Sequence, residues 1–156
     1  MYLITGGAFN GKKQWVRKEF ELDSKPYQWH SFYASDELEE WKMELIVLEG
    51  IERHVRRLIE KEEGSEAARE VWKEELAGWL NWETEKQGRQ LILIGTDITK
   101  GIVPANAFDR MWRDAAGWCF QDAAEKADQV IQIWYGLPQK IKMRGNNNNE
   151  TLYENR

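Results

Sequence analysis

The sequence predicts an α/β fold in which a parallel sheet carries helices on its faces. Three short runs are rich in aliphatic residues, at 45–48, 91–94 and 130–135. Such runs are typical of strands that are buried on both faces of a parallel sheet. The segments between them carry apolar residues at helical spacing. Strands that alternate with helices along a chain build a parallel sheet covered by helices.

The first third of the chain begins with an apolar run over residues 2–5, which predicts a buried strand running into a tight loop at Gly6-Gly7. Residues 12–21 then predict a helix, because Trp15, Val16 and Phe20 recur at helical spacing. A turn is expected at 23–26 and an aromatic-rich strand at 27–33. Ser35 can cap a short acidic helix over 36–42.

The remaining elements follow in alternation. Helices are expected over 51–62, ended by Gly64, over 65–86, capped by Ser65, and over 107–127. The inward faces of the last two helices are expected to consist of the residues Ala68, Trp72, Leu76, Trp79, Leu80, Phe108, Met111, Trp112, Ala115, Ala116 and Cys119. The strand over 130–135 is closed by Gly136-Leu137-Pro138, and residues 140–142 suggest a short edge strand.

Length and composition limit the function classes. The 156 residues suit one domain, which we place at residues 1–143, with a disordered tail over 144–156. A net charge of −5 argues against a nucleic-acid-binding face. No apolar run approaches a membrane span and no secretory leader is apparent, so we expect a cytoplasmic protein. The single cysteine excludes a disulfide framework.

The sequence Gly6-Gly7-Ala8-Phe9-Asn10-Gly11-Lys12 matches the G-x-x-x-x-G-K core of a phosphate-binding loop. Glycines let successive backbone N–H groups point at phosphate oxygens, and the helix that follows adds its positive N-terminal dipole. Lys12 is expected to reach the β- and γ-phosphates. The next position should be Ser or Thr, the Mg²⁺ ligand, but it is Lys13. Lys13 therefore supplies a charge in its place, marks decayed catalysis, or is an ordinary surface lysine.

Two carboxylates fall just past buried strands, where ligands bind in open parallel sheets. Glu49 follows residues 45–48, and Asp97 follows residues 91–94. Glu49 can hold Mg²⁺ directly or through water, or it is a solvated residue at a strand end. Asp97 can act as a base or metal contact, or it can cap a turn.

Other residues that often carry chemistry give weaker signals. His54 lies on a charged helix face and is expected to be solvated, and His30 follows Trp29 in the aromatic segment. Neither histidine has a metal-like partner nearby. Cys119 falls on an inward helix face, which favours a core role over a nucleophilic one. The nine tryptophans favour core packing and subunit contact over a flat-ligand site.

The segment Gly101-Ile102-Val103-Pro104, followed by Arg110-Met111-Trp112-Arg113-Asp114-Ala115-Ala116-Gly117, is distinctive. It resembles the GIVP and R-x-F-R-D-x-x-G segments of the adenosylcobinamide kinase/adenosylcobinamide-phosphate guanylyltransferase family of cobalamin biosynthesis. The opening Leu3-Ile4-Thr5-Gly6-Gly7-Ala8 and the closing Lys140-Ile141-Lys142 also match that family's pattern. The resemblance covers the loop and residues 91–142.

This resemblance implies a P-loop fold of the RecA-like kind, often assembled as a homo-oligomer. It implies a kinase that phosphorylates the cobinamide side-chain hydroxyl with ATP or GTP, and a guanylyl transfer through a histidine. By this resemblance Lys12, Glu49 and Asp97 would be catalytic, residues 6–13 would bind the nucleotide, and Glu49 would hold Mg²⁺. Arg110, Arg113 and Asp114 would hold the corrinoid substrate or a neighbouring subunit, or they form an intrahelical surface set.

The chain departs from the family pattern at several positions. Arg-Ser-Gly-Lys-Ser is Phe9-Asn10-Gly11-Lys12-Lys13 here, and Asn-Glu-Val is Thr96-Asp97-Ile98. The segment that bears the guanylylated histidine is missing between Glu21 and Lys25, and His30 falls beyond its place. We therefore expect a nucleotide-dependent cobinamide kinase without a guanylylated histidine. The alternatives are a non-catalytic nucleotide-binding or scaffold homologue, and a kinase for another small alcohol.

Overall fold

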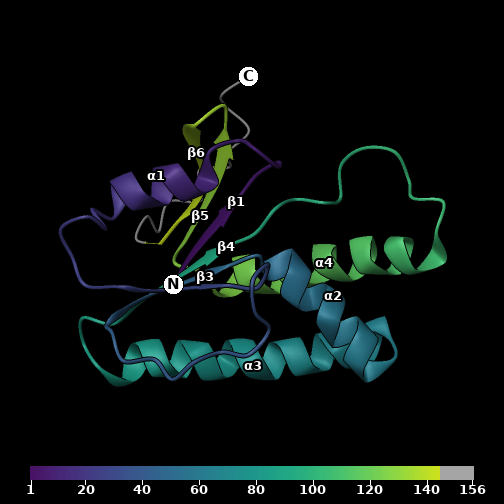
Figure 1. Ribbon diagram of the computed structural model, residues 1–156, viewed down its shortest axis with the longest axis horizontal. Coiled ribbons are helices and arrows are strands. Elements are labelled where there is room, and N and C mark those ends of the chain that lie inside the picture. Colours follow the sequence, from purple (N-terminus) through teal and green to yellow (C-terminus); the bar gives the residue numbers. More distant parts are fainter. Residues whose placement is uncertain (145–156) are drawn as a thin grey trace.

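The computed structural model describes residues 1–144 and has one six-stranded sheet with helices on both faces (Figure 1). The strands are β1 (Tyr2–Thr5), β2 (Gln28–Ser31), β3 (Leu45–Glu49), β4 (Gln90–Ile94), β5 (Gln129–Trp134) and β6 (Leu137–Met143). They lie in the order β2-β3-β4-β1-β5-β6. All neighbouring pairs are parallel except β5 and β6, which form an antiparallel hairpin. The expected α/β class with a parallel sheet is confirmed.

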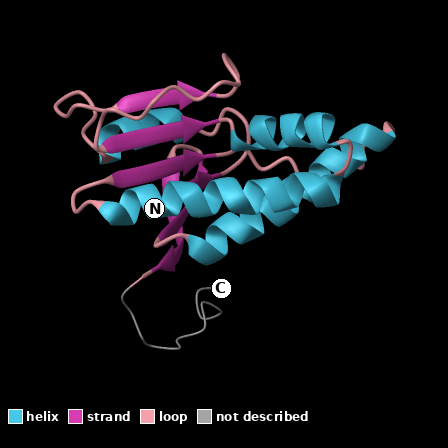
Figure 2. Cartoon of the chain, turned by 90° about the horizontal axis from the view of Figure 1, so that it is seen from below, coloured by secondary structure: helices cyan, strands magenta, loops and turns pink. Residues whose placement is uncertain are grey.

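The helices divide unequally between the two faces of the sheet. They are α1 (Lys12–Glu19), α2 (Ile51–Glu62), α3 (Ser65–Glu85) and α4 (Ala107–Lys126). Helix α1 covers one face, and the other three cover the opposite face (Figures 1 and 2). Alternate residues of each strand therefore enter two separate apolar clusters. In β1, Leu3 packs into the cluster with Trp72 of α3, and Ile4 packs into the cluster with Val16 of α1.

The expected helix over 36–42 is wrong, since these residues form no regular element. Five of the nine residues 36–44 are Asp or Glu, and like charges this dense oppose a short helix. Contacts with distant parts of the chain hold the segment instead. The side chain of Gln28 bonds the backbone of Glu40 and Lys42 at 3.0 Å each. Trp41 packs against Trp79 and Trp82 of α3.

Two smaller expectations need correction, and a third falls almost entirely outside the described residues. The last strand is longer than residues 140–142, because Leu137 and Pro138 pair with β5 in place of closing it. A two-residue turn at Tyr135-Gly136 joins these strands, and both residues have positive φ, as the tight turns of hairpins require. Met111 faces outward on α4. The expected tail, 144–156, lies outside the described residues apart from Arg144.

The sheet register brings the ends of three strands together. Ile4 of β1 lies beside Ile94 of β4, and Glu49 of β3 lies on the other side of Ile94. The loops that follow β1, β3 and β4 therefore leave the sheet at one edge. None of the helices within residues 1–144 is long and apolar enough to cross a membrane.

Candidate functional site

The loop between β1 and α1 adopts a wrapped conformation that depends on glycine. Gly6 has φ 142°, and Gly11, which precedes the first turn of α1, has φ 86°. Two backbone hydrogen bonds anchor the loop: the Asp97 N–H donates to Gly6 O, and the Gly136 N–H donates to Asn10 O, both at 2.9 Å. The loop is therefore tied to the end of β4 on one side and to the β5–β6 turn on the other.

Lys12 is the first residue of α1 and is buried under this loop, with 8% of its surface exposed. Its ammonium donates to Gly7 O at 2.7 Å and lies 3.3 Å from Gly6 O. Burial lowers the pKa of Lys12, and the charges of Glu52 and Glu49 oppose that shift. A buried cation held only by carbonyl oxygens and nearby carboxylates is prepared to bind an anion.

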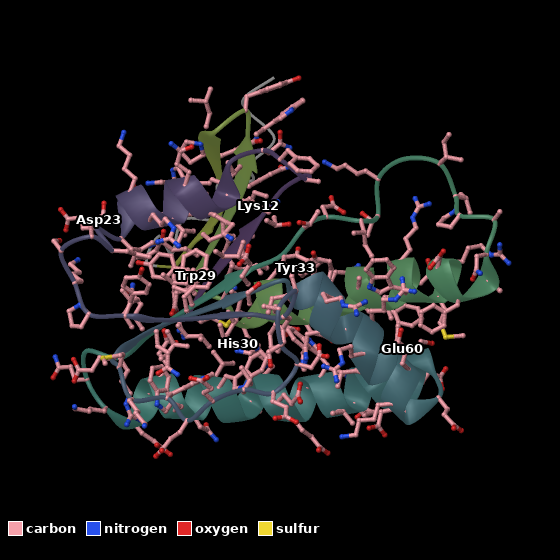
Figure 3. The ribbon with its side chains drawn as sticks, viewed as in Figure 1. Lys12, Asp23, Trp29, His30, Tyr33 and Glu60 are labelled. Atoms are coloured by element: carbon pink, nitrogen blue, oxygen red, sulfur yellow. The ribbon has the colours of Figure 1, made fainter. Side chains whose placement is uncertain are left out.

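Lys13 points toward β3 and pairs with Glu49, the last residue of that strand. The Lys13 ammonium lies 3.1 Å from Glu49 Oε1. The indole N–H of Trp29 donates to the other oxygen, Oε2, at 3.0 Å. Both oxygens of this buried carboxylate are therefore engaged. Figure 3 shows Trp29 on the α1 side of the sheet, where Lys13 and Arg17 also lie over its ring.

Glu52, in the first turn of α2, is a residue of the site that the sequence reasoning missed. It is only 4% exposed, and its carboxylate accepts a hydrogen bond from the Tyr33 hydroxyl and one from the Thr96 N–H, at 2.9 Å. Burial, with this carboxylate, raises the pKa of Tyr33. An acid at a helix N-terminus was the available signal, but the neighbouring charges suggested an exposed face.

These elements enclose one cavity of about 510 Å³. Its walls are residues 8–14 of the loop and α1, with Tyr33, Glu49, Ile94 and Thr96. Lys12 and Tyr33, both labelled in Figure 3, are among its walls. Of the residues expected to act at the site, Lys12, Lys13 and Glu49 therefore meet here, together with most of the phosphate-loop motif.

Asp97 lies at the margin, next to Thr96. Its Oδ1 accepts from the Thr99 N–H at 2.9 Å and from the Thr99 hydroxyl at 2.6 Å. Its Oδ2 lies 3.9 Å from the Lys100 ammonium. The carboxylate thus shapes the start of the 95–106 loop, and within residues 1–144 its Oδ2 has no donor closer than the Lys100 ammonium.

Arg110, Arg113 and Asp114 do not line the cavity. The guanidinium of Arg110 donates to Ala105 O at 2.6 Å and to Pro104 O at 3.0 Å, and that of Arg113 donates to Thr99 O. Both arginines therefore hold the loop over 99–105, which carries the exposed Ile102 and Val103. Asp114 is exposed on α4.

The histidines lie apart from the cavity. Figure 3 shows His30 on the opposite face of the sheet from Lys12, and its Nε2 is buried without a hydrogen-bond partner among residues 1–144. The expectation that His54 is solvated is wrong, because it is 7% exposed, stacks on Phe32 and lies 2.6 Å from Glu75. Phe32 follows β2 and Glu75 belongs to α3, so the charged sequence around His54 does not reveal these partners. Cys119 is buried, as expected.

Mg²⁺ takes oxygen ligands in octahedral geometry and keeps several waters. Lys13 stands where a hydroxyl ligand is needed, and both oxygens of Glu49 already accept from cationic or N–H donors. Both oxygens of Glu52 are also engaged. Within residues 1–144, no group of three or more His, Cys, Asp and Glu side chains is placed to hold a metal ion. Lys13, Glu49 and Glu52, as they lie here, do not fit a magnesium site.

Comparison with known proteins gives two findings. A family model described as cobinamide kinase / cobinamide phosphate guanyltransferase matches residues 23–141, most of the chain. The bifunctional adenosylcobalamin biosynthesis protein CobP of Pseudomonas aeruginosa is 36% identical over 58 residues, 37% of this chain. That match spans 33% of the relative's length.

Proposed function

Because the chain belongs to the cobinamide kinase / cobinamide phosphate guanyltransferase family, we propose that it is a nucleotide-dependent kinase that phosphorylates adenosylcobinamide. ATP or GTP binds in the cavity above residues 6–13, with its phosphates against the loop. The observation that carries this proposal is Lys12, a buried ammonium with a lowered pKa under a glycine-rich loop. When a phosphate binds there, its oxygens take the place of the carbonyl oxygens that accept from the Lys12 ammonium, and the new hydrogen bonds join two charged groups.

In the proposed reaction, the hydroxyl oxygen of the cobinamide side chain attacks the γ-phosphorus, and the bond from that phosphorus to the β–γ bridging oxygen breaks. The products are the phosphate ester and the nucleoside diphosphate. Lys12 neutralises charge on the β- and γ-phosphates, and the N-terminus of α1 adds its dipole. Asp97 Oδ2, the oxygen that Thr99 leaves free, takes the hydroxyl proton.

Guanylyl transfer is not part of this proposal. In the family that step goes through a guanylylated histidine, which would have to lie beside the bound nucleotide. His30 lies across the sheet from Lys12 (Figure 3), and neither it nor His54 lines the cavity. In this proposal Arg110 and Arg113 act indirectly, by holding the 99–105 loop.

A second candidate is a non-catalytic homologue that binds nucleotide and stabilises a partner of the pathway. It is favoured by the Lys13–Glu49 pair, which engages the acid expected to hold the metal. A kinase for another small alcohol is the third reading, since the missing segment between Glu21 and Lys25 belongs to the part that faces substrate in the family. Phosphorylation of adenosylcobinamide separates these candidates from the first.

The test combines binding with turnover. Isothermal titration with ATP and with GTP should show binding that Lys12→Ala weakens at least tenfold, roughly the 1.5–3 kcal/mol of a charge-assisted hydrogen bond. Lys18→Ala, at an exposed position on the same helix, is the matched control and should bind as the wild type does. Transfer of labelled γ-phosphate to adenosylcobinamide supports the kinase. Binding without transfer favours the non-catalytic homologue, and no binding rejects both.

A further inference from the structure

We propose that this site binds the nucleoside triphosphate without a divalent cation, and that the Lys13 ammonium occupies the place that Mg²⁺ takes in related loops. The inference rests on the proposed function, because it concerns the same cavity. The inference goes beyond the proposed function because it names the form of the ligand, which is the free triphosphate and not its magnesium complex. Three features of the site carry it.

The first feature is the state of Glu49. A carboxylate that ligates or positions a metal must present at least one free oxygen to the ion or its waters. Here Oε1 faces the Lys13 ammonium at 3.1 Å and Oε2 accepts from the Trp29 indole at 3.0 Å. The carboxylate itself is buried at the end of β3, whereas the Lys13 side chain that reaches it is exposed. While Lys13 stays on Oε1, a metal could reach Glu49 only by displacing that ammonium.

The second feature is that Lys13 is held yet free to move. Its side chain is 57% exposed, and its ammonium lies 5.7 Å from the centre of the Trp29 ring. An exposed lysine changes rotamer in nanoseconds or less, so the ammonium can turn from Glu49 toward a phosphate. Glu49 then keeps the hydrogen bond from Trp29, so its charge is not left without a donor.

The third feature is the balance of charge around the cavity. Lys12 and Lys13 both line it, and Glu49 lines it with Glu52 just behind. Glu52 accepts from Tyr33 and Thr96, and Glu49 keeps the Trp29 N–H when Lys13 turns away, so both ammonium groups can meet the triphosphate. A second lysine gives the loop a permanent positive charge at the point where related loops bind a metal ion to supply that charge.

The experiment titrates the purified protein with ATP and with inorganic triphosphate, once in excess EDTA and once in excess MgCl₂. For the wild type, the Kd for ATP in EDTA is expected to stay within about threefold of that in MgCl₂. Lys13→Ser removes the ammonium, restores the hydroxyl and frees Glu49 Oε1. This variant should lose affinity in EDTA by about tenfold or more and regain it in MgCl₂.

Two further variants keep the result interpretable. Lys13→Arg retains the charge and should bind in EDTA, and Lys18→Ser removes a charge from the exposed surface of α1 and should match the wild type. Thermal unfolding of each variant checks that it is folded. Paramagnetic resonance of Mn²⁺ gives a readout independent of affinity: Lys13→Ser with ATP should immobilise Mn²⁺ at the protein, and the wild type should not.

The outcomes separate the inference from the proposed function. Wild-type binding that is equal in EDTA and MgCl₂, with a metal requirement created by Lys13→Ser, supports both. Binding that appears only with MgCl₂, or Mn²⁺ held by the wild-type complex, overturns the inference and leaves nucleotide binding intact. Absence of ATP binding in both conditions overturns the proposed function and the inference together.

Discussion

Two adjacent glycines at the start of the phosphate loop should respond very differently to alanine. A Cβ added at Gly6 would overlap the carbonyl oxygen of Ile133 in β5, which is part of the backbone and cannot turn away. The φ of 142° at Gly6 also lies outside the range that L side chains favour. A Cβ at Gly7 would meet only the side-chain nitrogen of Asn10, at 2.7 Å, and an amide group can rotate.

The expected magnitude follows from these two costs. A strained backbone costs about 1–3 kcal/mol, and an overpacked contact that moves backbone costs about as much again. Gly6→Ala should therefore lower the free energy of unfolding by roughly 2–6 kcal/mol, a large part of the 5–15 kcal/mol typical of a domain. Gly7→Ala should stay within about 1 kcal/mol of the wild type, because alanine also restricts the unfolded chain.

Urea unfolding followed by circular dichroism measures both variants. With a slope of about 2 kcal/mol per molar, Gly6→Ala should shift the midpoint down by about 1–3 M, and its nucleotide binding should be lost or much weakened. Equal midpoints for Gly6→Ala and Gly7→Ala would refute the reasoning. In that case the end of β1 would have to move away from β5 at little cost, although Thr5 and Gln132 pair in the sheet.

Three other predictions follow from the structure. Burial holds the pKa of Lys12 below 10.5, so nucleotide affinity should fall as pH rises through that lowered pKa. Between the lowered pKa and 10.5, the free energy of unfolding should rise with pH, because the unfolded chain binds the Lys12 proton more tightly than the folded protein does. A Kd that is constant up to pH 10 would contradict this. Burial raises the pKa of Cys119 to about 12, so a thiol reagent should label it only as fast as the protein opens, and rapid labelling of the native protein would contradict the buried placement. Arg113→Ala should speed amide hydrogen exchange in residues 99–106 by roughly tenfold or more, since it removes a charged hydrogen bond to Thr99 O, while exchange in β4 stays unchanged.

The inner strands could be predicted from the sequence because local composition alone determines them. Leu45–Leu48 and Leu91–Ile94 are aliphatic throughout and are buried on both faces. The segment over 36–42 could not be predicted in the same way. Its conformation depends on Gln28 and on the tryptophans of α3, which are distant in sequence.

In the candidate site, too, the sequence predicted the features that depend on local sequence and missed those that depend on distant contacts. Glycine spacing and a following helix predicted the loop conformation around Lys12 because that pattern is local, and phosphate binding by the loop stays a prediction. Glu52 and its contact with Tyr33 escaped prediction because the burial of Glu52 arises only when α2 meets the end of β4, where Thr96 donates to Glu52. His54 was misjudged for a related reason: its partners Phe32 and Glu75 come from other elements. A charged local sequence does not reveal a buried pair between helices.

The family match and the phosphate loop are independent observations, since the match covers residues 23–141 and the loop ends at Lys13. The fold joins them, because Glu49 and Thr96 of the matched segment form the wall of a cavity whose floor is the loop. The presence of Lys13 in place of Ser or Thr can be interpreted from this arrangement of the loop and the matched segment. A loop that had merely decayed would leave an added lysine without a partner, whereas this one lies 3.1 Å from a buried carboxylate of β3. The change in the loop is thus matched by a contact outside it, which favours an altered way of neutralising phosphate charge over a lost one.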